Sequence, residues 1–506
     1  MKIRFGIKKN KVYDPFTENG VHHVTIPGVM RIHMRRDKSG NNLVWVNGTD
    51  LLIADKVAAN FIEVFIEKVW ENKSENNTIS PSVIENAVAK EMQVIYPRAQ
   101  EDLLRKDFNK VYNMLQNMAW GACPTHDLGV EVREIDSSTW TAPPRMDLAI
   151  TYRCNNDCGI CYAGGPRAVT ELSAEQWKKI LDKLWKIGVP QVVFTGGEAT
   201  CRPDLVELVK HSSEFVTGLI TNGRKLCLLA EELRDASLDY VQVSLESSHK
   251  EIHDKMVRTD GAWDETVQGI KKALELRMDV VTNTTLTQEN YYQFPELIKF
   301  GKELGLKTMA CNALICRGKG RKARQTEGLD ESQLKLILLR AQEVAQKSEI
   351  NLQWYSPTCY KRLNPIEFGF GIKACSAAQY NMTIEPDGRV IPCQSWIHEG
   401  VGNILTDPWE NIWQNPTCIA LRKGNFTEVE ECSNCLHLPT CGGGCPLEKI
   451  EIENTDALQV IKTRDSKDSF FYCDPPYFNA GMGHYDGYSK QDYENLLQLL
   501  YYPPKA

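Results

Sequence analysis

The sequence predicts an α/β fold built around parallel strands, and two patterns support this prediction. From residue 146 onward, a short apolar strand followed by a helical pattern recurs about six times. A different pattern, strands and then helices, precedes this region, and a cysteine-rich segment follows it. Alternating strands and helices build a parallel sheet or barrel, because each helix returns the chain across the sheet. In such barrels the chemistry lies at the carboxyl ends of the strands.

The 506-residue chain has room for about three domains of roughly 150 residues each. A linker with Thr and Pro near residues 137–144, and a cysteine-rich segment that starts near Cys359, mark candidate boundaries. We therefore expect an N-terminal module with its linker, a strand and helix core, a cysteine-rich domain and a short tail. Their predicted ranges are 1–140, 141–355, 356–473 and 474–506.

The N-terminal module is predicted to place a strand pair before three helices. Over residues 22–47, Met30, Ile32 and Met34 alternate with Arg31, His33 and Arg35 ahead of a turn at 37–40. Each predicted helix has one apolar face. These faces hold Val57, Phe61, Val64, Phe65 and Val69; then, after Ser80 and Pro81, Ile84, Val88 and Met92; and finally Leu104, Phe108, Val111 and Leu115.

Residues 20–118 resemble the PqqD-like recognition element of enzymes that modify ribosomally made peptides. The run Ala99 to Leu115, with Asp107 and Phe108, stands where that family has its last helix. The resemblance implies a winged-helix-like module that binds the leader segment of a precursor peptide. A generic winged-helix-like packing domain is the alternative, because a shared fold does not establish a shared function.

Six strands are predicted in the core, at residues 146–151, 191–195, 216–221, 240–245, 280–285 and 307–313. A helix between the first two begins at Ser173, where Gln176 three residues later completes a capping box. Gly188 is its predicted end. The predicted buried face of this helix holds Trp177, Ile180, Leu181 and Leu184.

Composition and charge narrow the class of protein. A formal net charge of −7 argues against coating nucleic acid or anionic lipid through bulk charge. The N-terminus lacks the apolar core of a signal peptide, and no run approaches the ~18 apolar residues of a membrane span. We expect a soluble cytoplasmic enzyme without a membrane partner, and nucleic acid is an unlikely partner.

The 17 cysteines point to metal. In a reducing compartment such a number favours metal binding or catalysis over disulfides. Eight cysteines fall after residue 370, and three lie within Cys154 to Cys161. Short spacings inside these groups suit compact iron–sulfur clusters.

Cys154, Cys158 and Cys161 follow the first core strand in a C-x3-C-x2-C run. Three thiolates can hold three irons of a 4Fe-4S cluster and leave the fourth iron open, as a catalytic metal site requires. Zinc is the alternative, although zinc usually takes four ligands and paired C-x2-C spacing.

This run resembles the motif of the radical S-adenosylmethionine (SAM) superfamily. The resemblance implies a partial (βα)6 barrel in which SAM chelates the open iron through its amino nitrogen and carboxylate oxygen. Reductive cleavage would then give methionine and a 5′-deoxyadenosyl radical. The run Thr195, Gly196, Gly197 and Glu198 resembles the family's GGE motif, which receives the methionine amino group.

Four further positions resemble SAM contacts of the family. Ser244 and Glu246 end the fourth strand, where the family places ribose or carboxylate contacts. Arg258 resembles an arginine suited to the methionine carboxylate, and Asn312 resembles a position on the adenosine side. The alternative for Ser244 and Arg258 is a capped strand end and a surface arginine. Cys201 departs from the family pattern, which has an apolar residue there.

The C-terminal cysteines resemble the SPASM motif, which implies two auxiliary 4Fe-4S clusters. The resemblance assigns Cys375, Cys393 and Cys445 to the first cluster, with Cys359 as the candidate fourth ligand. It assigns Cys432, Cys435, Cys441 and Cys473 to the second cluster. Zinc is again the alternative, because C-x2-C pairs often bind it.

Residues 469–500 resemble the DPPY region of DNA adenine methyltransferases, around Asp474, Pro475, Pro476 and Tyr477. No glycine-rich SAM-binding motif of that family precedes them. We interpret the tail as a fused remnant or a chance likeness, and this likeness puts the role of Cys473 as a ligand in doubt.

The leading functional hypothesis is an oxidoreductase that abstracts a hydrogen from a residue of a ribosomally made precursor peptide. Products such as a thioether or a carbon–carbon crosslink would follow, with flavodoxin or ferredoxin as electron donor. The basic loop 317–324 could meet an acidic peptide, although a solvated loop is the simpler reading. The alternatives are an enzyme that acts on a folded protein or a cofactor precursor, and a nucleic-acid-binding protein.

Overall fold

The computed structural model describes residues 3–4, 21–26, 30–36, 42–47, 50–72, 78–120, 140–165, 169–397, 399–424, 432 and 434–448. The chain forms two compact units, Met1–Leu447 and Glu448–Ala506. The predicted turn at 37–40, Cys473 and the whole DPPY-like region lie outside the described residues.

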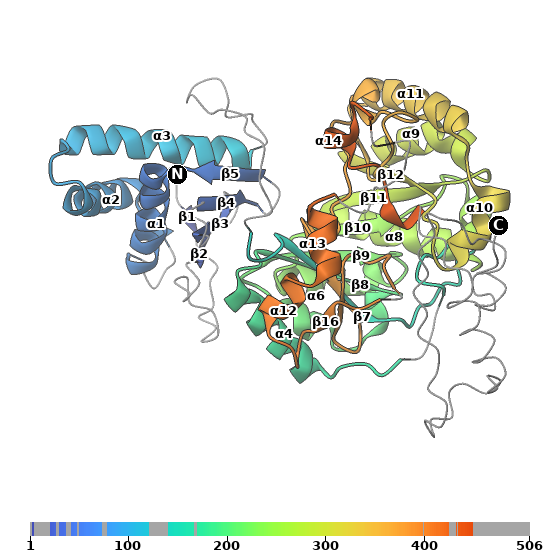
Figure 1. Cartoon of the computed structure of the whole chain (residues 1–506), viewed down its shortest axis with the longest axis horizontal. Helices are drawn as coiled ribbons and strands as arrows, with labels where there is room; N and C mark the ends of the chain where they lie inside the picture. Colours follow the sequence, from blue (N-terminus) through green and yellow to red (C-terminus); the bar gives the residue numbers. More distant parts are fainter. Residues whose placement is uncertain are drawn as a thin grey trace, which may run out of the picture. The chain divides into compact units, whose positions relative to one another are not determined.

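The N-terminal module is a four-stranded antiparallel sheet in the order β2-β3-β4-β5, with three helices beside it (Figure 1). The sequence predicted a strand pair here, whereas the structure has a four-stranded meander that β4 and β5 complete. The elements are β2 (Val21–Ile26), β3 (Met30–Arg36), β4 (Asn42–Val46), β5 (Asp50–Ala54), α1 (Lys56–Glu71), α2 (Pro81–Ile95) and α3 (Glu101–Ala119), with a short pair β1 (Ile3–Arg4) and β6 (Thr78–Ile79).

Helix α1 begins at the N-cap Asp55, whose side chain accepts a hydrogen bond from the Ala58 amide. Its apolar face packs on α3, where the Phe65 and Phe108 rings lie 5.7 Å apart. Phe61, Val64, Phe65 and Val69 are buried as predicted. The prediction was wrong for Val57, which is 46% exposed in the first turn of the helix.

The polar face of β3 is buried against the core. The Arg35 guanidinium donates to the carbonyls of Gly188 and Ala142, both at 3.1 Å. The His33 ring lies 3.1 Å from the Glu214 carbonyl, and Arg31 pairs with Asp239 at 2.6 Å. Both faces of this strand are therefore in contact with protein, although the alternation of residue types is typical of a sheet with one solvated face.

The core is a ten-stranded sheet in the order β13-β12-β11-β10-β9-β8-β7-β14-β15-β16. Strands β7 to β13 are parallel. All six predicted strands are present, each within one residue at either end. The strands are β7 (Arg145–Thr151), β8 (Gln191–Gly196), β9 (Val216–Thr221), β10 (Tyr240–Ser244), β11 (Asp279–Leu286), β12 (Thr308–Ala313) and β13 (Asn351–Trp354).

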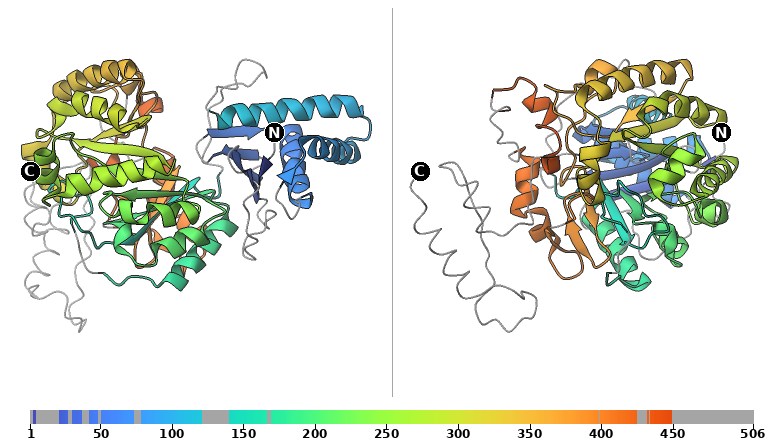
Figure 2. Two further views of the ribbon diagram at one scale, coloured as in Figure 1. Left: turned by 180° about the vertical axis from the view of Figure 1, so that it is seen from behind. Right: turned by 90° about the vertical axis from the view of Figure 1, so that its right-hand side faces the viewer.

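Helices between the strands lie along the outer face of the sheet, where their apolar stripes form one core with the strands (Figure 2). The last strand β13 was not predicted. The helices are α4 (Ala174–Ile187), α5 (Leu205–His211), α6 (Leu226–Asp235), α7 (Lys250–Val257), α8 (Ala262–Glu275), α9 (Phe294–Leu304), α10 (Lys319–Glu327) and α11 (Glu331–Lys347), with 3-10 turns η3 (Ala199–Cys201) and η4 (Tyr291–Gln293).

The start, the end and the buried face of helix α4 are all as the local sequence predicts. The Ser173 side chain accepts from the Gln176 amide, and the Gln176 side chain accepts from the Ser173 amide. Gly188 ends the helix in the left-handed conformation, at φ 93°. The four predicted core residues, Trp177, Ile180, Leu181 and Leu184, are all buried.

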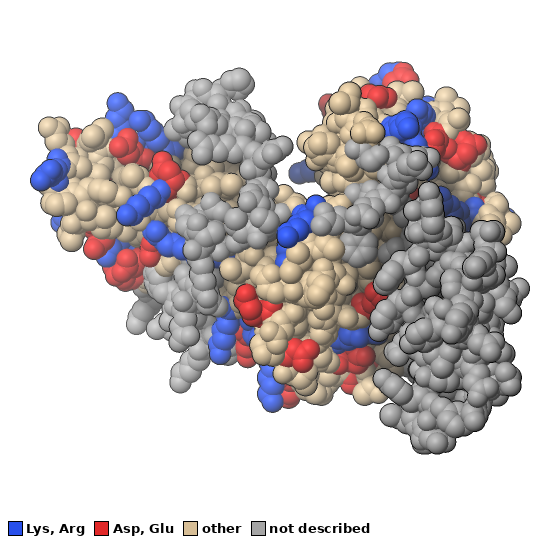
Figure 3. Space-filling view, in the orientation of Figure 1, with Lys and Arg blue, Asp and Glu red and all other residues tan. Residues whose placement is uncertain are grey.

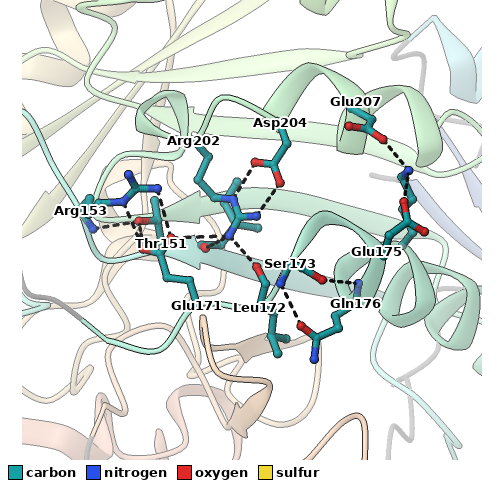
Figure 4. Close-up of polar contacts among 12 residues, drawn as sticks. Thr151, Arg153, Glu171, Leu172, Ser173, Glu175, Gln176, Arg202, Asp204 and Glu207 are labelled. Carbon is teal, nitrogen blue, oxygen red and sulfur yellow. Dashed lines mark hydrogen bonds and ion pairs between the residues drawn. The ribbon is translucent and has the colours of Figure 1, made fainter.

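An ion-pair network ties the start of α4 to the end of β7 (Figure 4). The buried Arg202 guanidinium donates to the carbonyls of Ile150 and Leu172, at 3.1 and 3.0 Å, and pairs with Asp204. Glu171 pairs with Arg153 at 3.2 Å. These contacts fix the chain immediately before the first cysteine group.

The C-terminal part adds a hairpin to the core sheet. Strand β14 (Asn381–Ile384) pairs in parallel with β7, and β15 (Arg389–Ile391) and β16 (Gly402–Asn403) continue the sheet. Trp409 and Trp413 donate to the carbonyls of Thr141 and Trp140, which anchors this part to the linker. Its helices and 3-10 turns are α12 (Trp409–Trp413), α13 (Pro416–Arg422), α14 (Leu438–Cys441), η5 (Pro365–Phe368) and η7 (Pro446–Glu448).

Acidic and basic side chains are interspersed on the described surface that Figure 3 shows. Within the described part of the chain, every helix is too short or too polar to cross a membrane.

The capping box gives a test of the fold. Ser173→Ala should lower the free energy of unfolding by about 1 kcal/mol, because an amide at the start of α4 loses its acceptor. Ser80→Ala is the matched control, since Ser80 is the N-cap of α2 but its side chain makes no capping bond. Denaturant unfolding of both variants measures the difference. Equal losses in the two variants would contradict the capping role.

Candidate functional site

The first cysteine group lies on the loop that leaves β7. Cys154, Cys158 and Cys161 all line one cavity of about 690 Å³, which extends along the parallel strands to their carboxyl ends. Parallel strands end at the same edge of a sheet, so residues that follow β8, β10, β11 and β12 reach this cavity too. The position predicted for the chemistry and the position of the cysteines therefore agree.

Neighbouring strand ends hold this loop. Asn222, after β9, donates to the Asn155 side chain at 2.7 Å, and Arg224 donates to the Asn156 side chain at 3.0 Å. Lys319 donates its amide to the Cys161 carbonyl at 2.9 Å, and its ammonium pairs with Asp157. Part of the basic loop thus binds the cysteine loop. Sequence reasoning missed Asn222 and Arg224, although a polar run directly after a strand was the available signal.

The cysteine side chains are suited to a positively charged ligand. Burial raises the pKa of Cys154 to about 11, and burial also raises the pKa of Cys158. Neighbouring thiols raise both values further. Thiolates in such surroundings need a compensating cation, and a bound metal supplies one.

The donor set fits an iron–sulfur cluster in type and position. Among the described residues, no group of three or more His, Cys, Asp or Glu side chains could hold a single metal ion. A four-iron cluster spaces its thiolates more widely than one ion does, because each thiolate binds a different iron. Three thiols on one loop at one cavity are compatible with that wider spacing.

The loop after β8 is pressed against the cysteine loop. Gly196 has φ 135°, and a Cβ there would collide with the Thr151 carbonyl oxygen. A Cβ at Gly197 would lie 2.6 Å from the Arg153 carbonyl oxygen. Glycine is therefore required at both positions because two backbone segments approach each other closely. The sequence had suggested instead that the backbone approaches a ligand there.

Glu198 is almost fully buried, and the protein occupies both carboxylate oxygens. Oε1 accepts from the Thr221 hydroxyl at 2.8 Å and from Thr200, while Oε2 accepts from the Asn222 amide at 2.7 Å. The carboxylate thus joins the loops after β8 and β9. It also lines the cavity, as do Gly196 and Gly197.

Ser244, Glu246 and Asn312 line the same cavity, next to Asn283 and Thr285 of β11. Asn312 accepts from Asn283 at 2.9 Å, and Glu246 accepts from the Thr285 amide at 2.9 Å. Burial raises the pKa of Glu246 to about 7. Asn283 and Thr285 were missed, because nothing local in β11 distinguishes inward polar residues from solvated ones.

Arg258 is the one predicted SAM contact that does not line the cavity. It ends α7 in the left-handed conformation, and its side chain is 55% exposed. The guanidinium lies against Gly159, where an added Cβ would be 3.1 Å from Nη2. Arg258 therefore borders the cysteine loop from outside.

The C-terminal cysteines fall into two groups. Cys375, Cys393 and Cys445 line the same cavity as the first cysteine group. Burial, together with a smaller contribution from Cys375, raises the pKa of Cys393 to about 12. Cys359 lies beside this group, since a Cβ at Gly444 would be 3.0 Å from its amide nitrogen.

The other group does not reach the cavity. Cys432 and Cys441 are buried, and the Cys435 amide donates to the Cys432 carbonyl at 3.1 Å. Cys473, the predicted fourth member, lies outside the described residues.

Two family models match the chain. Residues 148–301 match the radical SAM superfamily, and residues 375–436 match the iron–sulfur cluster-binding SPASM domain. Both matches agree with the resemblances read from the cysteine spacing. The chain thus contains a radical SAM domain and a SPASM domain, and the cofactors that these domains imply are SAM and iron–sulfur clusters.

The chain is similar to several known proteins. A PqqA peptide cyclase of Bradyrhizobium diazoefficiens is 29% identical over 348 residues, which is 65% of this chain and 88% of the relative. An Fe-coproporphyrin III synthase of Methanosarcina barkeri is 28% identical over 323 residues, 58% of this chain and 81% of the relative. The crystal structure of Streptococcus suis SuiB bound to precursor peptide SuiA has a TM-score of 0.56 at 16% identity, over 80% of this chain and 92% of SuiB. The likeness to SuiB concerns the fold.

Gly196→Ala tests the contact between the two loops. We expect loss of iron bound at the first cysteine group, because a Cβ at residue 196 displaces the end of β7. Gly261→Ala is the control: its φ is also positive, at 77°, but its Cβ would meet nothing within 4 Å. Iron and sulfide analysis of both purified variants gives the comparison. Full iron in the Gly196 variant would contradict the steric argument.

Glu246 predicts a pH dependence of stability. Its folded pKa of about 7 lies above the ordinary 4.5, so the free energy of unfolding falls as pH rises between these values. Above pH 7 the buried charge costs up to about 3 kcal/mol. Glu246→Gln should therefore raise the melting temperature at pH 8 and raise it less at pH 5.5.

Glu251→Gln, at an exposed position of α7, is the control and should leave the melting temperature unchanged at both pH 8 and pH 5.5. If Glu246→Gln raised the melting temperature equally at both pH values, burial of the Glu246 charge would not be the cause of the increase.

Proposed function

Because the chain contains a radical SAM domain and a SPASM domain, we propose that it is a maturase that modifies a ribosomally made precursor peptide. The reaction begins with reductive cleavage of SAM to methionine and a 5′-deoxyadenosyl radical, which abstracts a hydrogen from a peptide residue. Oxidation of the substrate then gives a product such as a thioether or a carbon–carbon crosslink.

One observation carries the proposal: the first cysteine group and three SPASM cysteines line the same cavity. A substrate in this cavity lies between the site that generates a radical and a site that can accept an electron. In our proposal Cys154, Cys158 and Cys161 hold the cluster that binds SAM. Gly196, Gly197, Glu198, Ser244, Glu246 and Asn312 shape the SAM site, and Arg258 supports it from outside the cavity.

We further propose two auxiliary clusters. Cys359, Cys375, Cys393 and Cys445 form the ligand set of the first, which faces the cavity. Cys432, Cys435, Cys441 and Cys473 form that of the second. An electron acceptor beside the substrate would allow a net oxidation of the peptide, and a flavodoxin or ferredoxin would supply the reducing electron.

The N-terminal module is proposed to bind the leader segment as a PqqD-like element. Trp45 of β4 and Leu51 of β5 line the same cavity as the cysteines, so the module contributes directly to the site. SuiB was crystallised with a precursor peptide, and the name of the Bradyrhizobium relative also specifies a peptide substrate. Both support a peptide as the substrate class.

The proposed domain organisation follows the sequence boundaries. Residues 1–140 hold the recognition module, 141–355 a partial (βα)6 barrel, 356–473 the SPASM domain and 474–506 the DPPY-like tail. The sheet order supports the barrel, because Arg145 on β7 and Tyr355 after β13 line one cavity although five strands separate β7 from β13.

A cofactor precursor is the second candidate substrate. The Methanosarcina relative is named for a reaction on a porphyrin, and its match extends over 58% of this chain. Coproporphyrin carries several carboxylates, whereas a peptide core carries those of its acidic residues. The experiments below separate the two substrates.

The cluster assignment predicts the iron content. Anaerobically purified protein should hold about twelve irons, the sum of three four-iron clusters. A variant with Cys154, Cys158 and Cys161 all changed to Ala should lose about four irons and all reductive SAM cleavage. A variant with Cys201 changed to Ala, outside the proposed ligand sets, should lose neither. Wild-type protein with only about four irons would contradict the SPASM assignment.

The substrate assignment is tested by anaerobic coexpression with a short peptide encoded beside the gene. Mass spectrometry should show the peptide lighter by two hydrogens, and hydrogen–deuterium exchange should show protection within residues 20–118 when the leader is added. An unmodified peptide together with turnover of a porphyrin would favour the second candidate. Protection confined to the core would contradict the role of the N-terminal module.

A further inference from the structure

Arg145 presents a positive charge to the cavity. Among the described residues that line the cavity, it is the one Lys or Arg. Its Nε donates to Asp147 Oδ1 at 2.6 Å, and the Arg145 side chain is 32% exposed while that of Asp147 is 1% exposed. Within the described part of the chain, Asp147 is the one hydrogen-bond and ion-pair partner of the guanidinium, and the Tyr240 and Tyr355 side chains also interact with it electrostatically. The outer Nη1 and Nη2 groups are therefore available to a ligand.

The position of Arg145 separates it from the proposed SAM contacts. Arg145 is the first residue of β7, and Thr151 lies six positions, or about 20 Å of strand, further along. The proposed SAM contacts stand at or after strand ends. Arg145 is instead next to Asn381 of β14, its partner in register, and both line the cavity.

Tyr355, at the end of β13, faces Arg145 across this side of the cavity. Strands β13 and β7 do not pair with each other, because five other strands lie between them in the sheet order. Arg145 and Tyr355 nevertheless line one cavity, so the sheet curves around it, and the edge of β7 on this side pairs with β14.

The electrostatics favour an anionic ligand at this position. Burial alone would lower the pKa of Arg145, but Asp147 together with Tyr240 and Tyr355 outweighs burial and the pKa is raised. The guanidinium is therefore charged at every working pH. Asp147 also lines the cavity, but its side chain is 1% exposed whereas that of Arg145 is 32% exposed, so the cation is the more accessible member of the pair. Asp147 acts as a positioning residue that holds Nε and leaves the outer edge of the guanidinium exposed.

We propose that Arg145 binds a carboxylate of the substrate, namely that of a Glu or Asp side chain in the precursor peptide. The planar edge formed by Nη1 and Nη2 matches a carboxylate through two parallel hydrogen bonds. The inference rests on the proposed function for the peptide nature of the substrate, and it adds an acidic residue near the residue that is modified. The methionine carboxylate of SAM has the same chemistry, so the experiment includes SAM.

The test uses the full-length, cluster-loaded chain and two probes, the acetylated and amidated tripeptides Gly-Glu-Gly and Gly-Gln-Gly. Ligand-observed NMR titrations give their dissociation constants. Wild-type protein should bind the Glu tripeptide about tenfold more tightly than the Gln tripeptide. Arg145→Met should remove the preference, and Arg145→Lys should retain part of it, since the charge remains but the planar fork is lost.

Two further variants control the interpretation. Arg145→Met leaves Asp147 buried without a counter-charge, so a double variant, Arg145→Met with Asp147→Asn, is made in case the single variant does not fold. It should also show no preference. Arg234→Met, on the surface of α6, is the matched control and should keep the wild-type preference.

Three results would overturn the inference. The first is equal or undetectable binding of both tripeptides by wild-type protein. The second is a preference for Glu that survives in Arg145→Met and in the double variant. The third is a tenfold loss of SAM affinity in Arg145→Met with the peptide preference unchanged, which would assign Arg145 to SAM. None of these results bears on the mass change of the coexpressed peptide, so the proposed function is judged separately.

Discussion

The close contact between the loops after β7 and β8 is the constraint on which the rest of the site depends. The Gly197 and Glu198 amides donate to the carbonyls of Thr151 and Arg153 at 2.8 and 2.9 Å, directly before the first cysteine. The buried Glu198 carboxylate then connects this pair to Asn222, which holds the cysteine loop from the next strand. Three strand ends thus fix the loop that carries the first cysteine group.

The same principle of satisfied buried polar groups extends across the molecule. Arg35 and Arg202 each donate to backbone carbonyls of separate segments, so one guanidinium takes the place of several backbone partners. Arg145 differs from both, because its outer edge faces the cavity. Arg145 is the one Lys or Arg among the described residues that line the cavity, and its side chain is 32% exposed, which is the basis for assigning it to the substrate.

Much of the fold could be predicted from local patterns. The capping box at Ser173 and the apolar runs at the six strands are signals contained within a few residues. The pairing of β14 with β7, the burial of the polar face of β3 and the inward position of Asn283 depend on partners far along the chain, which one sequence does not reveal. Spacing located the cysteines, but the reason for the glycines emerged only from the contact with Thr151.

The most direct test of the central claim is electron–nuclear double resonance of the reduced protein with SAM labelled by oxygen-17 in its carboxylate and nitrogen-15 in its amino group. A cluster that Cys154, Cys158 and Cys161 hold through three of its irons, with the fourth iron open, predicts hyperfine coupling of both labels to the cluster. Couplings that are present in wild-type protein and absent when these cysteines are changed to Ala would support the account. Reduced wild-type protein that binds labelled SAM without either coupling would contradict it.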